Sequence, residues 1–324
     1  MTISDFLITG GAGFIGSHLT DSLISDGYRV KILDDLSTGN LANLDSALKS
    51  DRCEFIQGSI LDQDLVEKCV EDTKHVIHLA AAVGVFNIVN NPLESFYTNF
   101  KGTENIVKFS AKRQIPILFA STSEIYGKNS QDFLDEDSDR ILGSPSLARW
   151  SYAEAKALDE FYLLNLSHKF NFDLRIIRFF NTVGPRQVGT YGMVIPRFVQ
   201  AALKGQPLQV FGDGSQTRCF MHIEDAVNGI RLILDSKKAV GKAINLGNHD
   251  EVSILFLARS VVDQLNSKSE IELIPYSDVF SSGFEDMLRR VPNTSLLKSL
   301  TGWEIQHSLS QIILDVSKGF IHQS

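Results

Sequence analysis

The sequence predicts an α/β protein: a Rossmann-type, doubly wound parallel sheet with a smaller, discontinuous α+β lobe. Three observations predict this architecture. Short apolar runs alternate with longer amphipathic stretches through roughly the first 180 residues, which is the pattern of a parallel sheet with helices on both faces. A glycine-rich loop follows the first apolar run. After Asn181 the alternation is replaced by turn-rich sequence, and we expect the second lobe to begin there.

The first lobe consists of buried strands that alternate with amphipathic helices. Strands covered on both faces are continuous apolar runs, and we expect them at residues 6–8, 30–33, 76–79, 117–119 and 174–177. Helices bury residues three and four positions apart, and we expect them at residues 17–25, 93–112 and 152–168. A strand at 243–246 is expected to return to the same sheet.

The second lobe is expected to be formed by two separate parts of the chain. Turn-rich segments at 184–186 and 211–215, a helix at 196–204 and a strand at 271–274 are its recognisable elements. The predicted division assigns 1–180 and 223–250 to the first domain. It assigns 181–222 and 251–324 to the second domain.

Composition excludes several classes of protein. The chain has 324 residues, a net charge of -8 and 43% hydrophobic residues, which is enough for a large core but lacks the basic excess of a nucleic-acid binder. No apolar run approaches the roughly 20 residues of a membrane span. The first strand begins too early to leave room for a signal peptide. Three scattered cysteines without metal-ligand spacing favour reduced thiols, no metal site and a cytoplasmic location.

The glycine loop predicts a dinucleotide site. Residues 9–18 read TGGAGFIGSH, with glycines at 10, 13 and 16 between a strand and a helix. Glycine allows the backbone to approach a pyrophosphate closely, and the positive end of the helix dipole favours that anion. Asp34 ends the second strand, where a carboxylate can accept hydrogen bonds from both ribose hydroxyls and repel a 2′-phosphate. Asp35 strengthens that repulsion, so the expected cofactor is NAD.

Tyr152 and Lys156 form the second informative motif, YAEAK. Four residues apart, they share one face of a helix. A phenol has an ordinary pKa of about 10, and a nearby ammonium lowers that value. Tyr152 is therefore expected to remove a proton from an alcohol as hydride leaves to the nicotinamide, and to return it in the reverse direction.

Further motifs extend along nearly the whole chain. HLAA (78–81), NFKGT (99–103), STSEIYG (121–127), RFFNTVGPRQ (178–187), GDGSQTRCFMHIEDA (212–226) and GW (302–303) follow in order. Together with the glycine loop and YAEAK, they resemble the extended short-chain dehydrogenase/reductases that modify nucleotide sugars, the NAD-dependent epimerase/dehydratase family. The motifs are specific for this family and only partly specific for the reaction.

The resemblance implies roles for individual residues. Thr122 is similar in position to the hydroxyl that orients the sugar C4 hydroxyl, Tyr152 to the catalytic base, and Lys156 to its partner on the nicotinamide ribose. Glu124 is the expected group for chemistry at C5 and C6. The expected substrate contacts are Phe86, Ser123, Asn181, Arg186, Arg218 and Arg290, with Asn181 and Arg218 on the phosphates. The second lobe would then bind the nucleotide sugar, which is expected to be UDP-linked.

The resemblance also implies a cofactor pocket. Its expected residues are Gly10, Gly13, Phe14, Ile15, Gly16, Asp34, Asp35, Ser59, Ile60, Leu79, Ala80, Ala81, Asn99, Tyr152 and Lys156. Ser59 departs from the family, which commonly has an aspartate there, although a serine can still form a hydrogen bond with adenine. Asn99 is expected to be structural or adjacent to the cofactor.

Three reactions remain open, because the family resemblance implies that each begins by oxidising the sugar at C4. Re-reduction on the other face gives a 4-epimer, loss of water a 4-keto-6-deoxy sugar, and loss of carbon dioxide from a uronic acid a pentose. The triplet TSE, which ends at Glu124, resembles UDP-glucuronate decarboxylases and GDP-mannose dehydratases. The dehydratases favour NADP, against Asp34, and glucose-type dehydratases have aspartate where this chain has Ser123. Arg290, shortly before a proline, resembles the decarboxylase pattern.

Other residues bear on the epimerase alternatives. Phe86 follows Gly84-Val85 where uronate 4-epimerases have arginine, and a phenyl ring cannot bind a carboxylate ionically. Arg149-Trp150, in contrast, also resembles enzymes known only as epimerases. We therefore expect a UDP-glucuronate-type decarboxylase, with a UDP-sugar 4-epimerase and then a 4,6-dehydratase as alternatives. If Glu124 is instead an ion-paired structural carboxylate, the epimerase interpretation gains.

Two further classes and an oligomeric state are also considered. A nucleotide-responsive regulator on this fold would not need Thr122, Tyr152 and Lys156 together, and a simple reductase would release NADH. Analogy with the family suggests a homodimer through the helices at 93–112 and 152–168. Leu158, Phe161 and Leu164 permit such a contact, but the same side chains could instead face the core.

Overall fold

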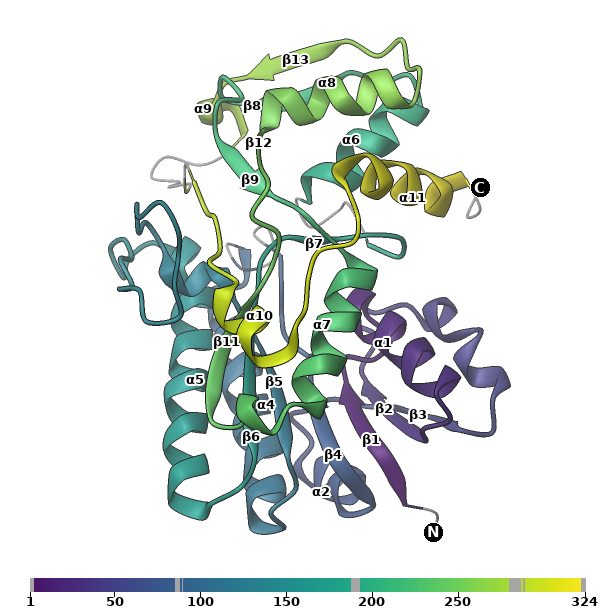
Figure 1. Ribbon diagram of the computed structural model, residues 1–324, viewed down its shortest axis with the longest axis vertical. Coiled ribbons are helices and arrows are strands. Elements are labelled where there is room, and N and C mark those ends of the chain that lie inside the picture. Colours follow the sequence, from purple (N-terminus) through teal and green to yellow (C-terminus); the bar gives the residue numbers. More distant parts are fainter. Residues whose placement is uncertain are drawn as a thin grey trace.

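The first lobe is built on one parallel sheet. The computed structural model describes residues 3–84, 88, 90–187, 193–279, 287 and 289–321. Seven strands in them form a sheet of order β11-β6-β5-β4-β1-β2-β3, in which every neighbouring pair is parallel (Figure 1). The strands are β1 (Ser4–Thr9), β2 (Val30–Asp34), β3 (Cys53–Gln57), β4 (Thr73–His78), β5 (Ile117–Thr122), β6 (Leu174–Phe179) and β11 (Lys242–Leu246). This arrangement confirms the predicted fold class.

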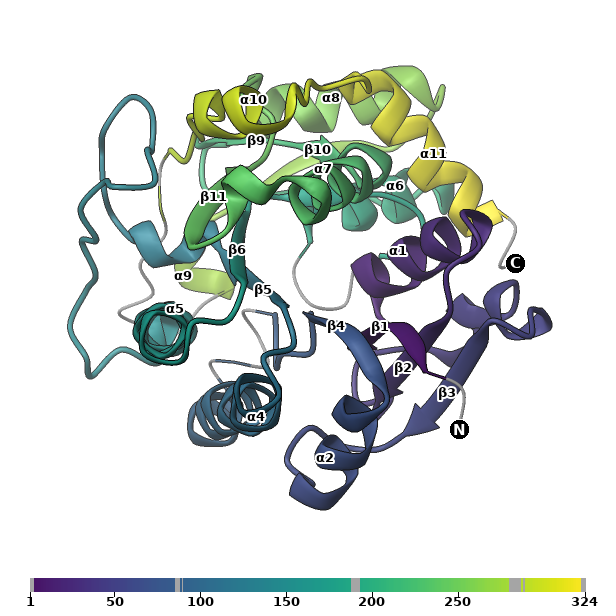
Figure 2. The ribbon, with the colours of Figure 1, turned by 60° about the horizontal axis from the view of Figure 1, so that its bottom comes forward.

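Helices cover both faces of this sheet (Figure 2). One face carries α1 (Phe14–Ser25) and α7 (Ile223–Asp235), and the other carries α2 (Gln63–Glu71), α4 (Pro92–Lys112) and α5 (Ser151–Phe170). Successive side chains of a strand point to opposite faces, and Leu7 and Ile8 accordingly enter two different apolar cores. In the described part of the chain, no helix is long and apolar enough to cross a bilayer.

Short 3-10 helices occur in several of the connections. They are η1 (Leu41–Leu44), η2 (Ala47–Lys49), η3 (Ser123–Tyr126), η4 (Ala148–Trp150) and η6 (Lys237–Ala239). Two of them begin next to residues of the candidate site, because η3 follows β5 directly and η4 directly precedes α5. These two turns set the positions of Glu124 and Arg149.

The second lobe has its own core, which lies at the top of Figure 1. Three two-stranded pairings contribute to it: β7 with β10, β8 with β13, and β9 with β12. The strands are β7 (Thr182–Val183), β8 (Leu208–Phe211), β9 (Thr217–Cys219), β10 (Met221–His222), β12 (Glu251–Ser253) and β13 (Ile271–Ile274). The helices are α6 (Val194–Leu203), α8 (Ile254–Gln264), α9 (Tyr276–Val279) and α11 (Leu309–Ile321). Apolar residues of α6, α8 and α11 pack together here.

The segment around α10 (Ser295–Thr301) lies with the first lobe, although the predicted division placed 251–324 in the second. Leu297 and Trp303 are buried in the same core as α1 and α7. The indole Nε1 of Trp303 donates a hydrogen bond to the carbonyl oxygen of Asp225, 3.0 Å away. Two large apolar side chains thus attach this segment to α7, and the packing surface rather than the order along the chain determines its place.

The strand β3 was not expected from the sequence. It lies at the edge of the sheet beside β2. Its residues are only partly covered, and none is fully buried. An edge strand of this kind lacks the continuous apolar run by which the inner strands were recognised.

Candidate active site

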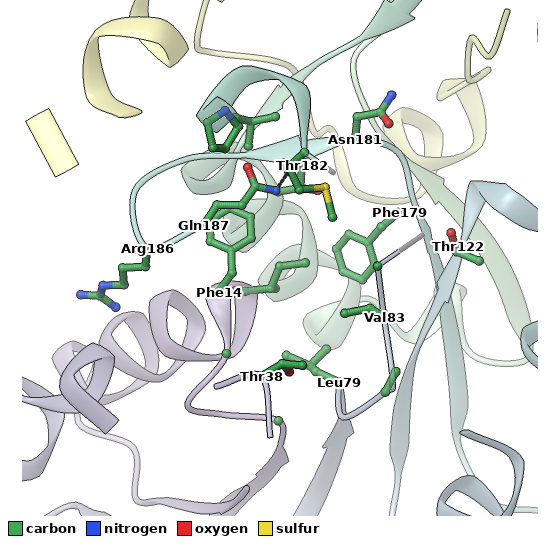
Figure 3. A pocket seen from close by; sticks show the side chains of 18 of the residues that line it. Phe14, Thr38, Leu79, Val83, Thr122, Phe179, Asn181, Thr182, Arg186 and Gln187 are labelled. Carbon is green, nitrogen blue, oxygen red and sulfur yellow. Dashed lines mark hydrogen bonds between the residues drawn. The ribbon is translucent and has the colours of Figure 1, made fainter. Parts of the chain in front are cut away.

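A cavity of about 1800 Å³ lies at the carboxyl ends of the sheet strands, with residues of both lobes in its wall. Figure 3 shows Phe14, Leu79, Val83, Thr122 and Phe179 around it. In open parallel sheets, ligands bind outside this edge of the sheet. Pockets for one small ligand usually measure about 300–1000 Å³, so this cavity has room for more than one ligand.

The glycine loop forms the part of the wall that follows β1. Gly10 has a φ of +73°, and a Cβ atom there would lie 2.7 Å from the backbone nitrogen of Ala80. A Cβ atom on Gly16 would overlap the carbonyl oxygen of Gly10. Gly13 is the N-cap of α1 and has no side chain that could occupy the helix end. The first backbone N–H groups of α1 are therefore available to an anion, which fits the pyrophosphate of a dinucleotide.

Asp34 is held in place at the end of β2. Its Oδ2 accepts a hydrogen bond from the backbone nitrogen of Ala12 at 2.9 Å, and its Oδ1 accepts one from Leu36 at 2.8 Å. Burial raises the pKa of this carboxyl, while the two N–H groups lower it. Each oxygen keeps a lone pair that can accept a ribose hydroxyl. The arrangement fits NAD and would repel a 2′-phosphate.

Most of the expected cofactor residues line the cavity. They are Gly10, Gly13, Phe14, Ile15, Gly16, Asp34, Asp35, Ile60, Leu79, Ala80, Ala81, Tyr152 and Lys156. Ser59 is not part of this wall, and its hydroxyl accepts a hydrogen bond from the backbone nitrogen of Leu61 at 3.2 Å. Asn99 is also outside it: its Oδ1 accepts from the nitrogen of Ala82 at 2.7 Å and its Nδ2 donates to the oxygen of Ala82 at 3.2 Å. Asn99 therefore supports the cavity wall from behind.

Tyr152 and Lys156 lie one turn apart on α5, and both face the cavity. The phenol of Tyr152 is hydrogen-bonded to the hydroxyl of Thr122. The Nζ atom of Lys156 donates to the carbonyl oxygen of Ala120 at 2.9 Å. Threonine, tyrosine and lysine thus lie together near the end of β5.

The pKa of Tyr152 differs from the sequence-based expectation. Burial raises this pKa above its ordinary value of 10, and the carboxylates of Glu124 and Asp159 raise it further. The hydrogen bond with Thr122 lowers it. A neighbouring lysine was expected to lower the pKa overall, but desolvation and two anions outweigh any such effect. In this structure the phenol is therefore protonated at neutral pH.

Glu124 lies between two buried arginines. Its Oε1 is 2.7 Å from Nη1 of Arg290, and its Oε2 is 2.6 Å from Nη1 of Arg149. The same nitrogen of Arg290 donates to Oγ of Ser123 at 3.0 Å. Burial raises the pKa of Glu124, but the two guanidinium groups outweigh burial and hold it at about 2. We call Glu124, Arg149 and Arg290 the arginine–glutamate cluster; all three residues line the cavity.

Arg149 is a candidate that the sequence interpretation did not name as a site residue. It lies in η4, immediately before α5, and its side chain is buried. Its sequence was noted only as part of an Arg-Trp pair. The signal available in the sequence was the position of Arg149 three residues before Tyr152. Residues three apart in a helical turn lie close together.

The other expected substrate residues have different positions. Asn181 and Arg218 line the cavity; Nδ2 of Asn181 donates to the carbonyl oxygen of Cys219 at 2.9 Å, and Nη1 of Arg218 donates to that of Thr217 at 2.7 Å. Arg186 also lines it, but its guanidinium lies 2.7 Å from the carboxylate of Asp21 on α1 and points away in Figure 3. Phe86 lies outside the described residues.

Comparison with known proteins now defines the family. Residues 6–247 match the NAD dependent epimerase/dehydratase family. The chain belongs to this family. The resemblance inferred from the motifs is thereby confirmed. The protein is an enzyme, and its cofactor is NAD.

Three relatives are similar to this chain along nearly the whole of its length. A UDP-N-acetyl-alpha-D-glucosaminuronate decarboxylase of Bacillus cytotoxicus is 41% identical over 295 residues, which cover 91% of this chain and 90% of the relative. UDP-glucuronic acid decarboxylase 1 of Danio rerio is 33% identical over 98% of this chain and 74% of its own length. The structure of UDP-glucuronic acid 4-epimerase from Bacillus cereus with UDP-glucuronic acid and NAD superposes with a TM-score of 0.89 at 27% identity, covering 99% of this chain and 100% of the epimerase.

Proposed function

We propose that this enzyme decarboxylates a UDP-linked hexuronic acid. The observation that carries the proposal is the arginine–glutamate cluster, in which two buried guanidinium groups share a single carboxylate. Glu124 is ionised at neutral pH because its pKa is about 2. The two guanidinium groups place positive charge at the wall of the cavity. The carboxylate of a uronic acid is an anion that such guanidinium groups bind well.

The position of the cluster matches the chemistry of such a substrate. Glu124 lies two residues after Thr122, and Thr122 is hydrogen-bonded to Tyr152. A sugar whose C4 hydroxyl lies at Thr122 and Tyr152 would direct its C6 carboxylate toward the arginine–glutamate cluster. A neutral hexose would offer these guanidinium groups no carboxylate to bind. The site therefore favours a uronate over a neutral sugar.

The proposed reaction begins with removal of the C4 hydroxyl proton by the phenolate form of Tyr152, which the ammonium of Lys156 and the positive charge of a bound nicotinamide would favour. Bound NAD would supply the hydride acceptor for C4. In the 4-keto uronate, the C5–C6 bond breaks, carbon dioxide leaves and the electron pair moves into the C4 carbonyl as an enolate. C5 then takes up a proton from water. As the hydride returns to C4, the phenol of Tyr152 gives its proton back to the C4 oxygen. In this scheme Lys156 is the cationic partner of Tyr152, and Arg149 and Arg290 hold the carboxylate until it leaves.

Relatives support the assignment of the substrate class. Two of those described above are decarboxylases of UDP-linked uronic acids. We propose that Arg218 and Asn181, in the wall next to the second lobe, face the nucleotide diphosphate, since a guanidinium fork suits phosphate oxygens. We propose that Ser123 contacts the sugar. It lines the cavity, and a hydrogen bond from Arg290 fixes its hydroxyl there.

We also propose that the enzyme is a homodimer through α4 and α5. These helices lie side by side on one face of the sheet (Figure 2). Between them they expose several large apolar side chains: Leu93, Phe96, Tyr97, Leu158 and Phe161. Leu164 instead packs against the core. Exposed apolar side chains on two neighbouring helices are typical of a protein–protein contact.

A substrate comparison tests the proposed reaction. The protein is incubated with NAD and, in parallel, with UDP-glucuronate, UDP-N-acetylglucosaminuronate, UDP-glucose and UDP-N-acetylglucosamine, and products are identified by mass and NMR. We expect a mass loss of one carbon dioxide from a uronate and no product from the matched neutral sugars. A 4-epimer of a neutral sugar, or a 4-keto-6-deoxy product, would contradict the proposal.

A further inference from the structure

A chain of buried hydrogen bonds connects β1, β4 and α4 to α5, the helix that carries Tyr152 and Lys156. The hydroxyl of Thr9 accepts from the nitrogen of Ala80 at 3.3 Å and lies 2.6 Å from Nδ1 of His78. Nε2 of His78 lies 3.2 Å from the hydroxyl of Thr103. That hydroxyl donates to Oδ2 of Asp159 at 3.2 Å. The chain connects the wall of the NAD pocket to a carboxylate on α5.

All donors in this chain can point toward Asp159. Thr9 accepts from Ala80, so its own proton is available to Nδ1 of His78. The proton of a neutral His78 then lies on Nε2, which donates to Thr103. His78 is neutral because burial, and to a lesser degree the charge of Lys156, hold its pKa at about 3. The hydroxyl of Thr103 also lies 2.8 Å from the carbonyl oxygen of Asn99, which competes for its proton.

Asp159 lies three residues after Lys156 on α5, so the two side chains are neighbours on the surface of that helix. Both side chains are buried, with 0% of Asp159 and 2% of Lys156 exposed. Burial lowers the pKa of Lys156, whereas the charges of Asp159 and Glu160 raise it. Glu160 is already engaged by Arg178 in an ion pair of 2.7 Å. Oδ1 of Asp159 is buried and has no hydrogen-bond partner among the residues that the structure describes.

We propose that Asp159 is a positioning residue for the catalytic pair: its carboxylate is the buried counter-ion that keeps Lys156 an ammonium, and the chain from Thr9 through His78 and Thr103 holds that carboxylate. The inference rests on the proposed roles of Tyr152 and Lys156. It adds a group that does not line the cavity and acts only through Lys156 and Tyr152.

The charge of Asp159 has a predictable effect on both members of the pair. It raises the pKa of Lys156 and also that of Tyr152. The other charged groups acting on this region are Glu160 on α5 and Glu124 in η3, and both stay in place when Asp159 is changed. Asp159→Asn should therefore move the ionisation of phenol and ammonium in the same direction, to lower pH. Loss of one neighbouring charge shifts the pKa of a buried group by about one unit.

Infrared spectroscopy of the protein with bound NAD tests the ionisation of Asp159 without any substrate. Burial raises the pKa of Asp159, whereas Lys156 and Thr103 lower it. The resulting pKa is about 7. The difference spectrum between wild type and Asp159→Asn should contain a carboxylic acid C=O band that disappears as pH rises through about 7. Thr103→Val removes the hydrogen bond but keeps the charge, so the band should persist to higher pH. The matched control Thr103→Ser keeps the hydroxyl and should titrate like wild type.

The pH dependence of turnover tests the effect on catalysis. Asp159→Asn should move the acid limb and the alkaline limb of the pH profile of kcat to lower pH by about one unit. The reason is that Tyr152 and Lys156 both lose a neighbouring anion, which lowers the pKa of each. A merely structural role would lower kcat and leave both limbs in place, and that result would overturn the inference. So would an acid band that persists over the whole pH range of activity, since Asp159 would then carry no charge. If the band titrates as expected but no uronate is decarboxylated, the proposed function is wrong and the infrared result still supports Asp159 as the charge beside Lys156.

Discussion

The carboxylate of Glu124 lies 2.7 Å from the guanidinium of Arg290, and this ion pair joins the end of β5 to the segment that precedes α10. Arg149, in η4 directly before α5, binds the second oxygen. Three distant parts of the chain thus place one anion and two cations at the wall of a single cavity. Under the proposed function, these two guanidinium groups favour a uronate over a neutral sugar.

Replacing Tyr152 should separate proton transfer from binding. Tyr152→Phe removes only the phenolic hydroxyl, and we expect kcat to fall by about 1000-fold, the usual contribution of a general base. The affinity for NAD should stay within about twofold of wild type, since none of the contacts to the glycine loop or Asp34 changes. Steady-state kinetics and NAD titration measure the two quantities. An equal loss of NAD affinity would contradict the role of Tyr152 as the base.

Glu124→Gln should impair the later chemistry and the stability together. We expect transient NADH formation to continue while release of carbon dioxide falls at least tenfold. The reason is that the neutral glutamine side chain would no longer hold the guanidinium groups of Arg149 and Arg290 by ion pairs, so the uronate would be less well oriented. Stopped-flow absorbance and carbon dioxide release distinguish the two steps. If product forms at the wild-type rate, Glu124 is structural. Glu154→Gln is the matched control, since Glu154 is exposed and paired with Arg140 on the surface.

The same variant makes a prediction about pH and stability. The folded-state pKa of Glu124 is about 2, below its ordinary 4.5. Its contribution to stability is therefore complete above pH 4.5 and is lost as pH falls toward 2. At pH 7 we expect Glu124→Gln to lower the free energy of unfolding by about 3 kcal/mol. Urea unfolding at pH 7 and pH 3 should show a large difference from wild type at the first pH and a smaller one at the second.

Asp34 should determine the choice of cofactor. Asp34→Ser removes the carboxylate that would accept the ribose hydroxyls, and we expect the Kd for NAD to rise at least tenfold, since a hydrogen bond to a charged group contributes about 1.5–3 kcal/mol. Discrimination against NADP should decrease at the same time. Asp51→Asn is the control, because Asp51 is exposed and does not line the cavity. Fluorescence titration with both cofactors measures these effects, and unchanged NAD affinity in Asp34→Ser would be evidence against this site.

The proposed dimer makes a prediction about one phenylalanine. Phe161 on α5 is 65% exposed, and Phe161→Glu would bury a charge in the contact between two copies. We expect the variant to be a monomer in analytical ultracentrifugation, while wild type is a dimer. Phe256→Glu on α8 changes a similarly exposed ring in the other lobe and should leave the dimer intact. A monomeric wild type would exclude the proposed contact.

Much of the fold could be predicted because it follows from local patterns. The apolar runs of the inner strands, the glycine loop before α1 and the spacing of Tyr152 and Lys156 depend only on residues close together in the chain. The edge strand β3 was missed because its side chains are half covered. The segment with Trp303 was assigned to the other lobe because nothing near it in the sequence indicates that it packs on α7.

By itself, the sequence determined the sheet, the dinucleotide loop and the acid–base helix, and through the family motifs it determined NAD as the cofactor. Only the tertiary structure decided that Arg149 and Arg290 share Glu124, that Asp159 lies at the end of a chain from Thr9, and that the pKa of Tyr152 is raised. The physical reason is the same in all three cases. Charge, hydrogen bonding and desolvation depend on which distant residues become neighbours after folding, and no local pattern records those neighbours.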